Sequence, residues 1–240
     1  LRQDGPQLDA ALSLSQASLR DQPLTLEKGS LALNRGELAL DLALRGGQAA
    51  NTIDLRGRIP LSPSSEDMEL RLASRGDGLR FLSALAQPGL SWQQGSADLQ
   101  LLVRGSLSAP LANGFLRLRQ GQLQLSGQTV RELEATVLFD FRELELQELT
   151  ARIGSRGRLS GSGLLGLLDP IGETARPLRL QLAQAPFTLP RLRGQADGEL
   201  LIRGALRQPE LGGELRLSRG LLNVQLGQLA TEANPSRPLT

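Results

Sequence analysis

Residues 95–125 read GSADLQLLVRGSLSAPLANGFLRLRQGQLQL, and residues 194–224 repeat them without a gap as GQADGELLIRGALRQPELGGELRLSRGLLNV. The two copies share 15 of 31 residues, which are alternating apolar residues, turn glycines and one proline each, Pro110 and Pro209. Alternation gives a strand one apolar and one polar face, so each copy is predicted to be a strand-turn-strand module. Such modules stack into elongated arrays, because each has an apolar face that it cannot bury alone. We therefore expect the function to lie in a long surface.

The same alternation recurs along most of the chain, and short turn signals such as Gly46-Gly47 separate the runs. Regularly spaced short strands of this kind predict an all-β meander of consecutive antiparallel hairpins. We expect one continuous repetitive unit over residues 1–230, with related repeat modules near residues 79–125 and 194–224.

Two segments depart from this rhythm. Residues 78–86, GLRFLSALA, place leucines at helical spacing ahead of a Pro-Gly pair, which predicts a single short helix. Residues 231–240, TEANPSRPLT, are polar and proline-bearing, which predicts a flexible tail. One short helix is thus the only helical element expected beside the strands.

Strands with one apolar face need a cover for that face, and one short helix cannot supply it. The sheet can fold over as a sandwich, close into a barrel or curl into a half-open trough. Alternation alone favours a sandwich core. The repeat and an aromatic content of only 2% favour the trough, because dry sandwiches use bulky, rigid anchors and membrane barrels carry aromatic girdles. We expect an elongated, curled antiparallel sheet with a half-open groove.

The alternating apolar residues are the predicted lining of that groove. Leucine supplies 56 of the 240 residues, and its flexible apolar end suits a partner without a fixed shape. A genomic codon bias towards Leu, Arg, Ala and Gly explains the leucine content equally well. The predicted lining residues are Leu38, Leu40, Leu42, Leu44, Leu70, Leu72, Leu99, Leu101, Val103, Leu116, Leu118, Leu123, Leu125, Leu178, Leu180, Leu182, Leu200, Ile202, Leu215 and Leu217.

Reactive side chains are scarce. The chain contains no cysteine, histidine or tyrosine, which removes thiol nucleophiles, imidazole bases and most zinc and copper sites. We therefore expect neither an enzyme nor a bound cofactor. The net charge is only +2 and basic residues interleaved with aromatics are missing, so no nucleic-acid partner is expected. No run of about 18 uncharged apolar residues occurs, so we expect no transmembrane helix in this stretch.

Charged residues recur at equivalent positions of the two repeat copies. Asp98 and Asp197 lie 99 residues apart, so they are predicted to be surface or turn residues rather than a catalytic carboxylate pair. Arg104 and Arg203 each precede a turn glycine. They could contact lipid head groups at the rim of the groove or keep a strand edge soluble, and the solubility role is favoured.

The repeated string reads VRGSLSAPLANGFLRLRQGQL in one copy and IRGALRQPELGGELRLSRGLL in the other, each after a strand that contains Gly-x-Ala-Asp. This string resembles the TamB family, the AsmA-like envelope-spanning lipid-transfer proteins that include a chloroplast-envelope relative. The resemblance implies that the chain is a fragment of the repetitive β region, folded as a β-taco, which is a curled sheet with an apolar interior. The composition, with 26 arginines against the single Lys28, is typical of a cyanobacterial source.

The resemblance also implies a role between two membranes. A segment of this kind is expected to conduct phospholipid acyl chains along the groove, with an Omp85-type outer-membrane assembly protein as partner of the full-length chain. The implied location is the periplasm, or the plastid intermembrane space, with an inner-membrane anchor outside this stretch. The alternative is a structural scaffold that links inner- and outer-envelope machinery for protein translocation or outer-membrane protein assembly.

Overall fold

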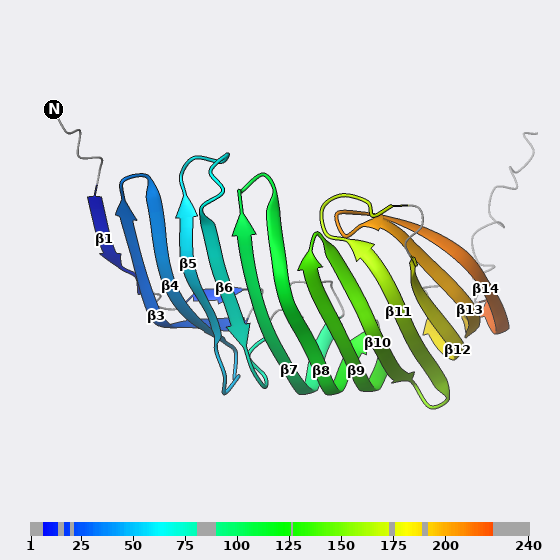
Figure 1. Cartoon of the computed structure of the whole chain (residues 1–240). Coiled ribbons are helices and arrows are strands. Elements are labelled where there is room, and N and C mark those ends of the chain that lie inside the picture. The colour runs from blue at the N-terminus through cyan, green and yellow to red at the C-terminus, as the bar shows by residue number, and fades with distance from the viewer. Residues whose placement is uncertain are drawn as a thin grey trace, which may run out of the picture.

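The structure, a computed structural model, describes residues 7–13, 17–19, 22–80, 90–125, 127–172, 176–188 and 192–222. These residues form one open sheet of 14 strands, which extends across the whole molecule in Figure 1. The predictions of an all-β fold and of a long antiparallel sheet are confirmed. The strands are β1 (Gln7–Ala11), β2 (Ala17–Leu19), β3 (Gln22–Asn34), β4 (Glu37–Gly46), β5 (Ile53–Pro60), β6 (Met68–Ser74), β7 (Leu90–Gly105), β8 (Pro110–Leu125), β9 (Gln128–Phe141), β10 (Glu143–Ile153), β11 (Gly157–Gly166), β12 (Leu178–Thr188), β13 (Leu192–Ala205) and β14 (Gln208–Leu222).

The topology is a meander in which strands that follow one another in the chain are hydrogen-bonded neighbours. From β3 to β14 each strand pairs antiparallel with the next, while β1 and β2 both pair with β3. A short parallel contact between Gly166 and Ala205 also joins β11 to β13. Antiparallel neighbours can be joined by short turns, as β3 and β4 or β9 and β10 are, although longer connections lie between β6 and β7 and between β11 and β12.

The two repeat copies occupy equivalent hairpins, β7–β8 and β13–β14. At the hairpin ends, Gly105 pairs with Pro110 in the first copy and Gly204 pairs with Pro209 in the second. The middle of each hairpin keeps the same register as well. The equivalent pairs there are Ala97–Leu118 and Ala196–Leu217, Leu99–Leu116 and Gly198–Leu215, and Leu101–Gly114 and Leu200–Gly213.

The glycine that both copies have at positions 114 and 213 is required for steric reasons. Gly114 and Gly213 have φ angles of 149° and 115°, a conformation that side-chain-bearing residues rarely adopt. A Cβ atom at either position would overlap a main-chain carbonyl oxygen of the preceding strand, that of Gln100 or of Glu199. Both copies therefore need glycine at this point, inside a strand that is otherwise rich in leucine.

Two expectations fall wholly or mainly outside the described residues. Most of the predicted helix over residues 78–86 lies in residues 81–89, which the structure does not describe, and Gly78 and Leu79 ahead of them lie in a turn. The predicted tail, residues 231–240, is also outside the described part. The extent of the repetitive unit, residues 1–230, stays a prediction.

The buried core is small and divided into two clusters. The first centres on Ile53, Leu79, Ala97 and Leu99, with Trp92 packed against it. The second centres on Val130, Leu133 and Ala151 in β9 and β10. Among the described residues no large side chain is completely buried, because the sheet has no second layer to cover it.

Candidate functional site: a leucine-lined hollow

The pairing register gathers the apolar residues into rows that cross the sheet. Residues directly opposite each other on paired strands point to the same face, so a row of partners is a row of neighbouring side chains. One row crosses from β4 to β11 and another from β7 to β14. The first consists of Leu42, Leu55, Leu72, Leu101, Gly114, Phe139, Leu144 and Leu165, and the second of Ala97, Leu118, Ala135, Leu149, Gly161, Leu180, Leu200 and Gly213.

All twenty predicted lining residues belong to this face, which we call the apolar face. Sixteen of them are half-buried, and Leu99 is buried. The remaining three are exposed, with exposed fractions of 39% for Leu125, 42% for Leu215 and 59% for Leu217. The residues are thus brought together in one surface, and their contact with lipid stays a prediction.

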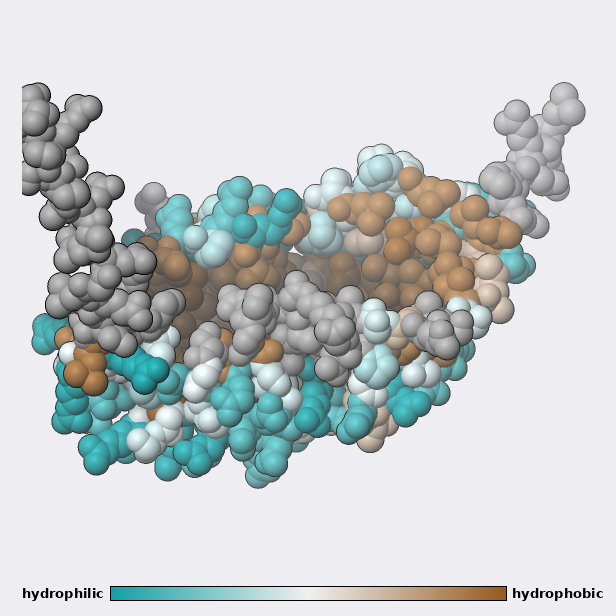
Figure 2. All heavy atoms as spheres, turned by 180° about the vertical axis from the view of Figure 1, so that it is seen from behind, coloured by the Kyte–Doolittle hydropathy of each residue, from teal (hydrophilic) through white to brown (hydrophobic). Residues whose placement is uncertain are grey.

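The apolar face is hollowed. Figure 2 shows hydrophobic residues gathered in an elongated hollow, with hydrophilic residues along its rims. The hollow follows the long dimension of the sheet, and its leucines are only partly covered by their neighbours. Half-buried leucines in rows form a surface that can take up further apolar groups without first opening a packed core.

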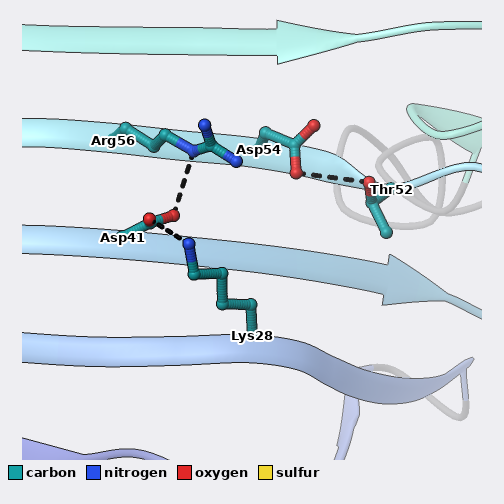
Figure 3. A network of polar contacts seen from close by, with 5 residues as sticks. All are labelled: Lys28, Asp41, Thr52, Asp54 and Arg56. Carbon is teal, nitrogen blue, oxygen red and sulfur yellow. Dashed lines mark hydrogen bonds and ion pairs between the residues drawn. The ribbon is translucent and has the colours of Figure 1, made fainter.

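The opposite face of the sheet carries charges that form ion pairs between strands. On this polar face, Asp41 of β4 binds both Lys28 of β3 and Arg56 of β5, with 3.0 Å between the Arg56 Nε and the Asp41 Oδ1 (Figure 3). The hydrogen bond from Lys28 and the charge of Arg56 hold the pKa of Asp41 below its ordinary value, although partial desolvation opposes them. Alternation therefore separates a charged surface from an apolar one on the same strands.

A second group of charges lies further along the polar face. Glu69 of β6 accepts hydrogen bonds from Arg104 of β7, at 2.9 Å, and from Arg71, at 2.8 Å. The hydrogen bond from Arg104 lowers the pKa of Glu69 most, and Arg71 adds to the effect. Arg104 thus forms an ion pair with an acid on the polar face, and its role in solubility stays a prediction.

The repeat-equivalent aspartates have structural partners on this face. Asp98 forms an ion pair with Arg119, at 3.5 Å, and Asp197 accepts a hydrogen bond from the main-chain N–H of Gln184, at 2.8 Å. Each lies on a strand, so the alternative of a turn position is wrong, while the surface placement agrees with the partly exposed side chains. Neither carboxylate lies near the other, since they belong to separate hairpins.

The sequence interpretation missed several lining residues. Ile53, Leu55 and Ile59 of β5 alternate on the apolar face, but Gly57 interrupts their run and the strand was not included in the predicted lining. Strands β9 and β10 also contribute to this face. Their missed residues are Val130, Leu133, Ala135, Val137, Phe139, Leu144, Leu146, Leu149, Ala151 and Ile153. A search for alternation that allows glycine at an apolar position would have found β5.

Smaller depressions on the polar face are a different kind of surface. One of them has a volume of about 580 Å³ and is lined by residues of β11 to β14, among them Arg158, Asp197, Glu199 and Arg216. Its charged side chains already have partners in part, since Arg179 binds Glu199 at 3.3 Å. Within the described residues, no group of three or more acidic side chains is arranged to hold a metal ion.

Comparisons with known proteins agree with the resemblance drawn from the repeat. The TamB family, by its C-terminal domain, matches residues 147–237, which include β11 to β14. The chain is 26% identical over 147 residues to the rice protein SUBSTANDARD STARCH GRAIN 4, chloroplastic, and 25% identical over 157 residues to TIC236, chloroplastic, of Arabidopsis thaliana. These alignments cover 60% and 63% of the chain, and the chain spans only 7% of the length of either relative. No solved structure matches significantly.

One further property bears on membranes. In the part of the chain that the structure describes, no helix has both the length and the apolar character needed to cross a bilayer.

Proposed function

We propose that this chain, whose similarity to the TamB family is confirmed over residues 147–237, is a segment of an envelope-associated protein that conducts phospholipid acyl chains along its apolar face. The continuous apolar face, in which most of the leucines are only half-buried, carries this proposal. A location between two envelope membranes, and an Omp85-type partner of the full-length protein, belong to the same proposal. The similarity to two chloroplastic proteins supports an envelope or plastid setting.

The hollow suits acyl chains because it is long and apolar. Each methylene that leaves water gains roughly 0.8 kcal/mol, so a long acyl tail gains enough to remain on the apolar face. Neighbouring sites are nearly equivalent where leucine follows leucine, as across Leu42, Leu55 and Leu72. A tail can therefore move from one site to the next with little change in free energy, and no residue need react with it.

The polar face and the ion pairs support the same function indirectly. Charges such as Asp41 and Arg56 keep the outer surface in water while the inner surface contacts lipid. The protein thereby presents its polar face to water and its apolar face to lipid, as a conduit in an aqueous space requires.

Native mass spectrometry with lipid extraction tests the proposal on the chain purified without detergent. We expect phospholipid to remain bound through purification. A folded, lipid-free chain that also takes up no phospholipid from vesicles would contradict the proposal and favour a scaffold that links envelope machinery.

A further inference from the structure

One long edge of the sheet carries exposed apolar side chains at its hairpin ends. Because the strands are antiparallel, the β5–β6, β7–β8, β9–β10, β11–β12 and β13–β14 connections all lie at this edge, which is the upper edge in Figure 1. At each of these five hairpin ends a large apolar residue is exposed. These residues, which we call the tip residues, are Leu61 (56% exposed), Leu107 (47%), Phe141 (56%), Leu168 (37%) and Leu206 (58%).

The opposite edge of the sheet differs. From β4 to β11 its described connecting residues are 47–52, 75–80, 127 and 154–156, and no large apolar residue among them is exposed. The tip residues are five of the twelve large apolar residues that are exposed in the described part of the chain. A single exposed leucine is common on a protein surface, but a regular row at one edge indicates a surface that contacts an apolar partner.

Main-chain hydrogen bonds between neighbouring connections hold this row in place. The N–H of Leu61 donates to the carbonyl oxygen of Gly36 in the β3–β4 turn, at 2.7 Å. The N–H of Leu206 donates to the carbonyl oxygen of Gly166, at the end of β11, at 2.8 Å. The tip residues are therefore presented at fixed places along the edge, with one hairpin, or about 9.6 Å of sheet, from one to the next.

Phe141 is the tip residue that is hardest to explain by folding alone. Its φ angle is 56°, in the left-handed region that costs a bulky side chain free energy and that glycine and asparagine favour. The chain has only five phenylalanines, and this one is 56% exposed at a hairpin end. Glycine or asparagine would suit both the backbone and the solvent better. An aromatic residue at this position therefore indicates contact with an apolar phase.

Charged side chains of both signs lie among the tip residues. Arg142 follows Phe141 and Arg207 follows Leu206, and both arginines are exposed and form no ion pair in the described part of the chain. A guanidinium group can bind a phosphate through two hydrogen bonds, while its apolar stem packs against lipid. Over all the connections of this edge the charges balance, since four arginines stand against four acids. They are Arg35, Arg142, Arg176 and Arg207, and Glu66, Asp67, Asp169 and Glu173.

We propose that this edge, which we call the tip edge, docks on the surface of a zwitterionic phospholipid bilayer. The tip residues enter the apolar layer, and the neighbouring charges meet the phosphate and ammonium groups of the lipids. Polar residues separate the tip residues from one another. They therefore form no continuous patch for a folded protein to bury, whereas a fluid lipid layer admits each of them separately.

This contact is separate from the proposed conduction of acyl chains on the apolar face. The tip edge is one rim of the sheet, and four hairpin steps from Leu61 to Leu206 give it a length of about 38 Å. Docking along it brings one side of the hollow next to the membrane surface. Lipid would then have a lateral way into the hollow as well as a way through its ends.

Flotation of the full chain with vesicles of pure phosphatidylcholine tests the docking. We expect the wild-type chain to float with the vesicles, and Leu107→Ser/Leu206→Ser to bind at least about fivefold more weakly. Because the charges of the edge balance, an increase in NaCl from about 0.1 to 0.5 M should change binding by less than about twofold. A chain that does not float, or one that high salt releases, would overturn the proposal.

Two controls separate the tip edge from the rest of the surface. Leu8→Ser/Leu221→Ser removes two other leucines, which are 61% and 75% exposed, and should float as the wild type does. Leu101→Asp changes the apolar face and should also float as the wild type does, whatever its lipid content. Equal losses in the two paired variants would show unspecific adhesion. A loss in Leu101→Asp with full binding by the tip pair would assign the vesicle contact to the hollow, and either result overturns docking through the tip edge.

A fluorescent label shows which edge meets the bilayer. The chain contains no cysteine, so a single introduced cysteine carries an environment-sensitive dye at one place. Ala109→Cys puts the dye in the β7–β8 turn of the tip edge, and Ser155→Cys puts it in the β10–β11 turn of the opposite edge, both at exposed positions. We expect vesicles to brighten the dye at position 109 several-fold, nitroxide-labelled lipid to quench it, and the dye at position 155 to stay unchanged. Equal responses of the two dyes would contradict docking through this edge.

Discussion

Gly114 of β8 lies so close to Gln100 of β7 that a Cβ atom at position 114 would overlap the Gln100 carbonyl oxygen. The φ angle of 149° at Gly114 adds to the penalty for any side chain. We expect Gly114→Ala to lower the free energy of unfolding by about 2 kcal/mol or more, measured by denaturant unfolding.

Gly212→Ala is the matched control for this change, because no atom lies within 4 Å of a Cβ at that position. It is expected to change the free energy of unfolding by less than about 0.5 kcal/mol. A Gly114→Ala variant as stable as Gly212→Ala would show that the close approach of these strands is not required.

The stability of the sheet is expected to be most sensitive to the shortening of side chains in the second core cluster. Leu133 is 7% exposed and packs with Val130 and Ala151. Leu133→Ala removes buried apolar contacts and leaves a cavity, so we expect a loss of about 2–4 kcal/mol in unfolding free energy. Leu107→Ala, at a position that is 47% exposed, should have little effect in the same unfolding measurement. Comparable losses in the two variants would be inconsistent with a separate core.

A single carboxylate ties together two connections of the sheet. Asp77, after β6, accepts hydrogen bonds from the N–H groups of Ala50, at 2.9 Å, and of Asn51, at 3.0 Å, in the β4–β5 loop. Partial burial by itself would raise the pKa of Asp77, but these hydrogen bonds outweigh it and lower the pKa below the ordinary 3.8. We expect Asp77→Ala to lower the free energy of unfolding by about 1–2 kcal/mol near neutral pH. This figure already allows for the screening of the carboxylate by nearby solvent.

The lowered pKa of Asp77 also fixes the direction of the pH effect. The stabilisation is complete above the unfolded pKa of 3.8 and is lost as the pH falls through the lower folded pKa. We therefore expect the difference between wild type and Asp77→Ala to shrink below about pH 4, when unfolding is followed at several pH values. A difference that stays constant down to pH 2 would mean that the carboxylate charge is not involved.

Neighbouring leucines on opposite faces provide a matched test of the proposed lipid conduit. Leu101 lies in a row of the apolar face, while Leu102 pairs with Arg71 and Asn113 on the polar face. We expect Leu101→Asp to reduce bound phospholipid several-fold in native mass spectra and Leu102→Asp to leave it near the wild-type level. Circular dichroism establishes that both variants are folded. Equal lipid content in the two would argue against the apolar face as the binding surface.

The sequence predicted the general form of the fold well, because alternation and turn glycines are local signals. Runs such as residues 38–44 and 99–103 identify strands and their apolar face without knowledge of distant neighbours. The repeat added that the hairpins are equivalent, and the register bears this out at Gly105–Pro110 and Gly204–Pro209.

Other features depend on contacts between strands and were not predictable in the same way. The requirement for glycine at position 114 comes from the carbonyl of Gln100. That carbonyl lies on the neighbouring strand, and the sequence alone does not show that the two residues are close. Arg104, which binds Glu69, and the main-chain N–H groups that bind Asp77 likewise come from another strand and from a loop. The degree of burial of each leucine depends on how far the sheet curls, so sequence could place residues on a face but could not rank them.

In a meander, the length of the sheet across its strands depends on the number of strands. Equivalent hairpins β7–β8 and β13–β14 are six strands apart, and neighbouring strands are spaced by about 4.8 Å, so the 99-residue offset between the two copies corresponds to about 29 Å of sheet. Each strand depends mainly on its two neighbours, so whole repeats can be gained or lost without rebuilding the remainder. In a protein built in this way, the number of such modules sets the length of the sheet, in steps of about 3 nm.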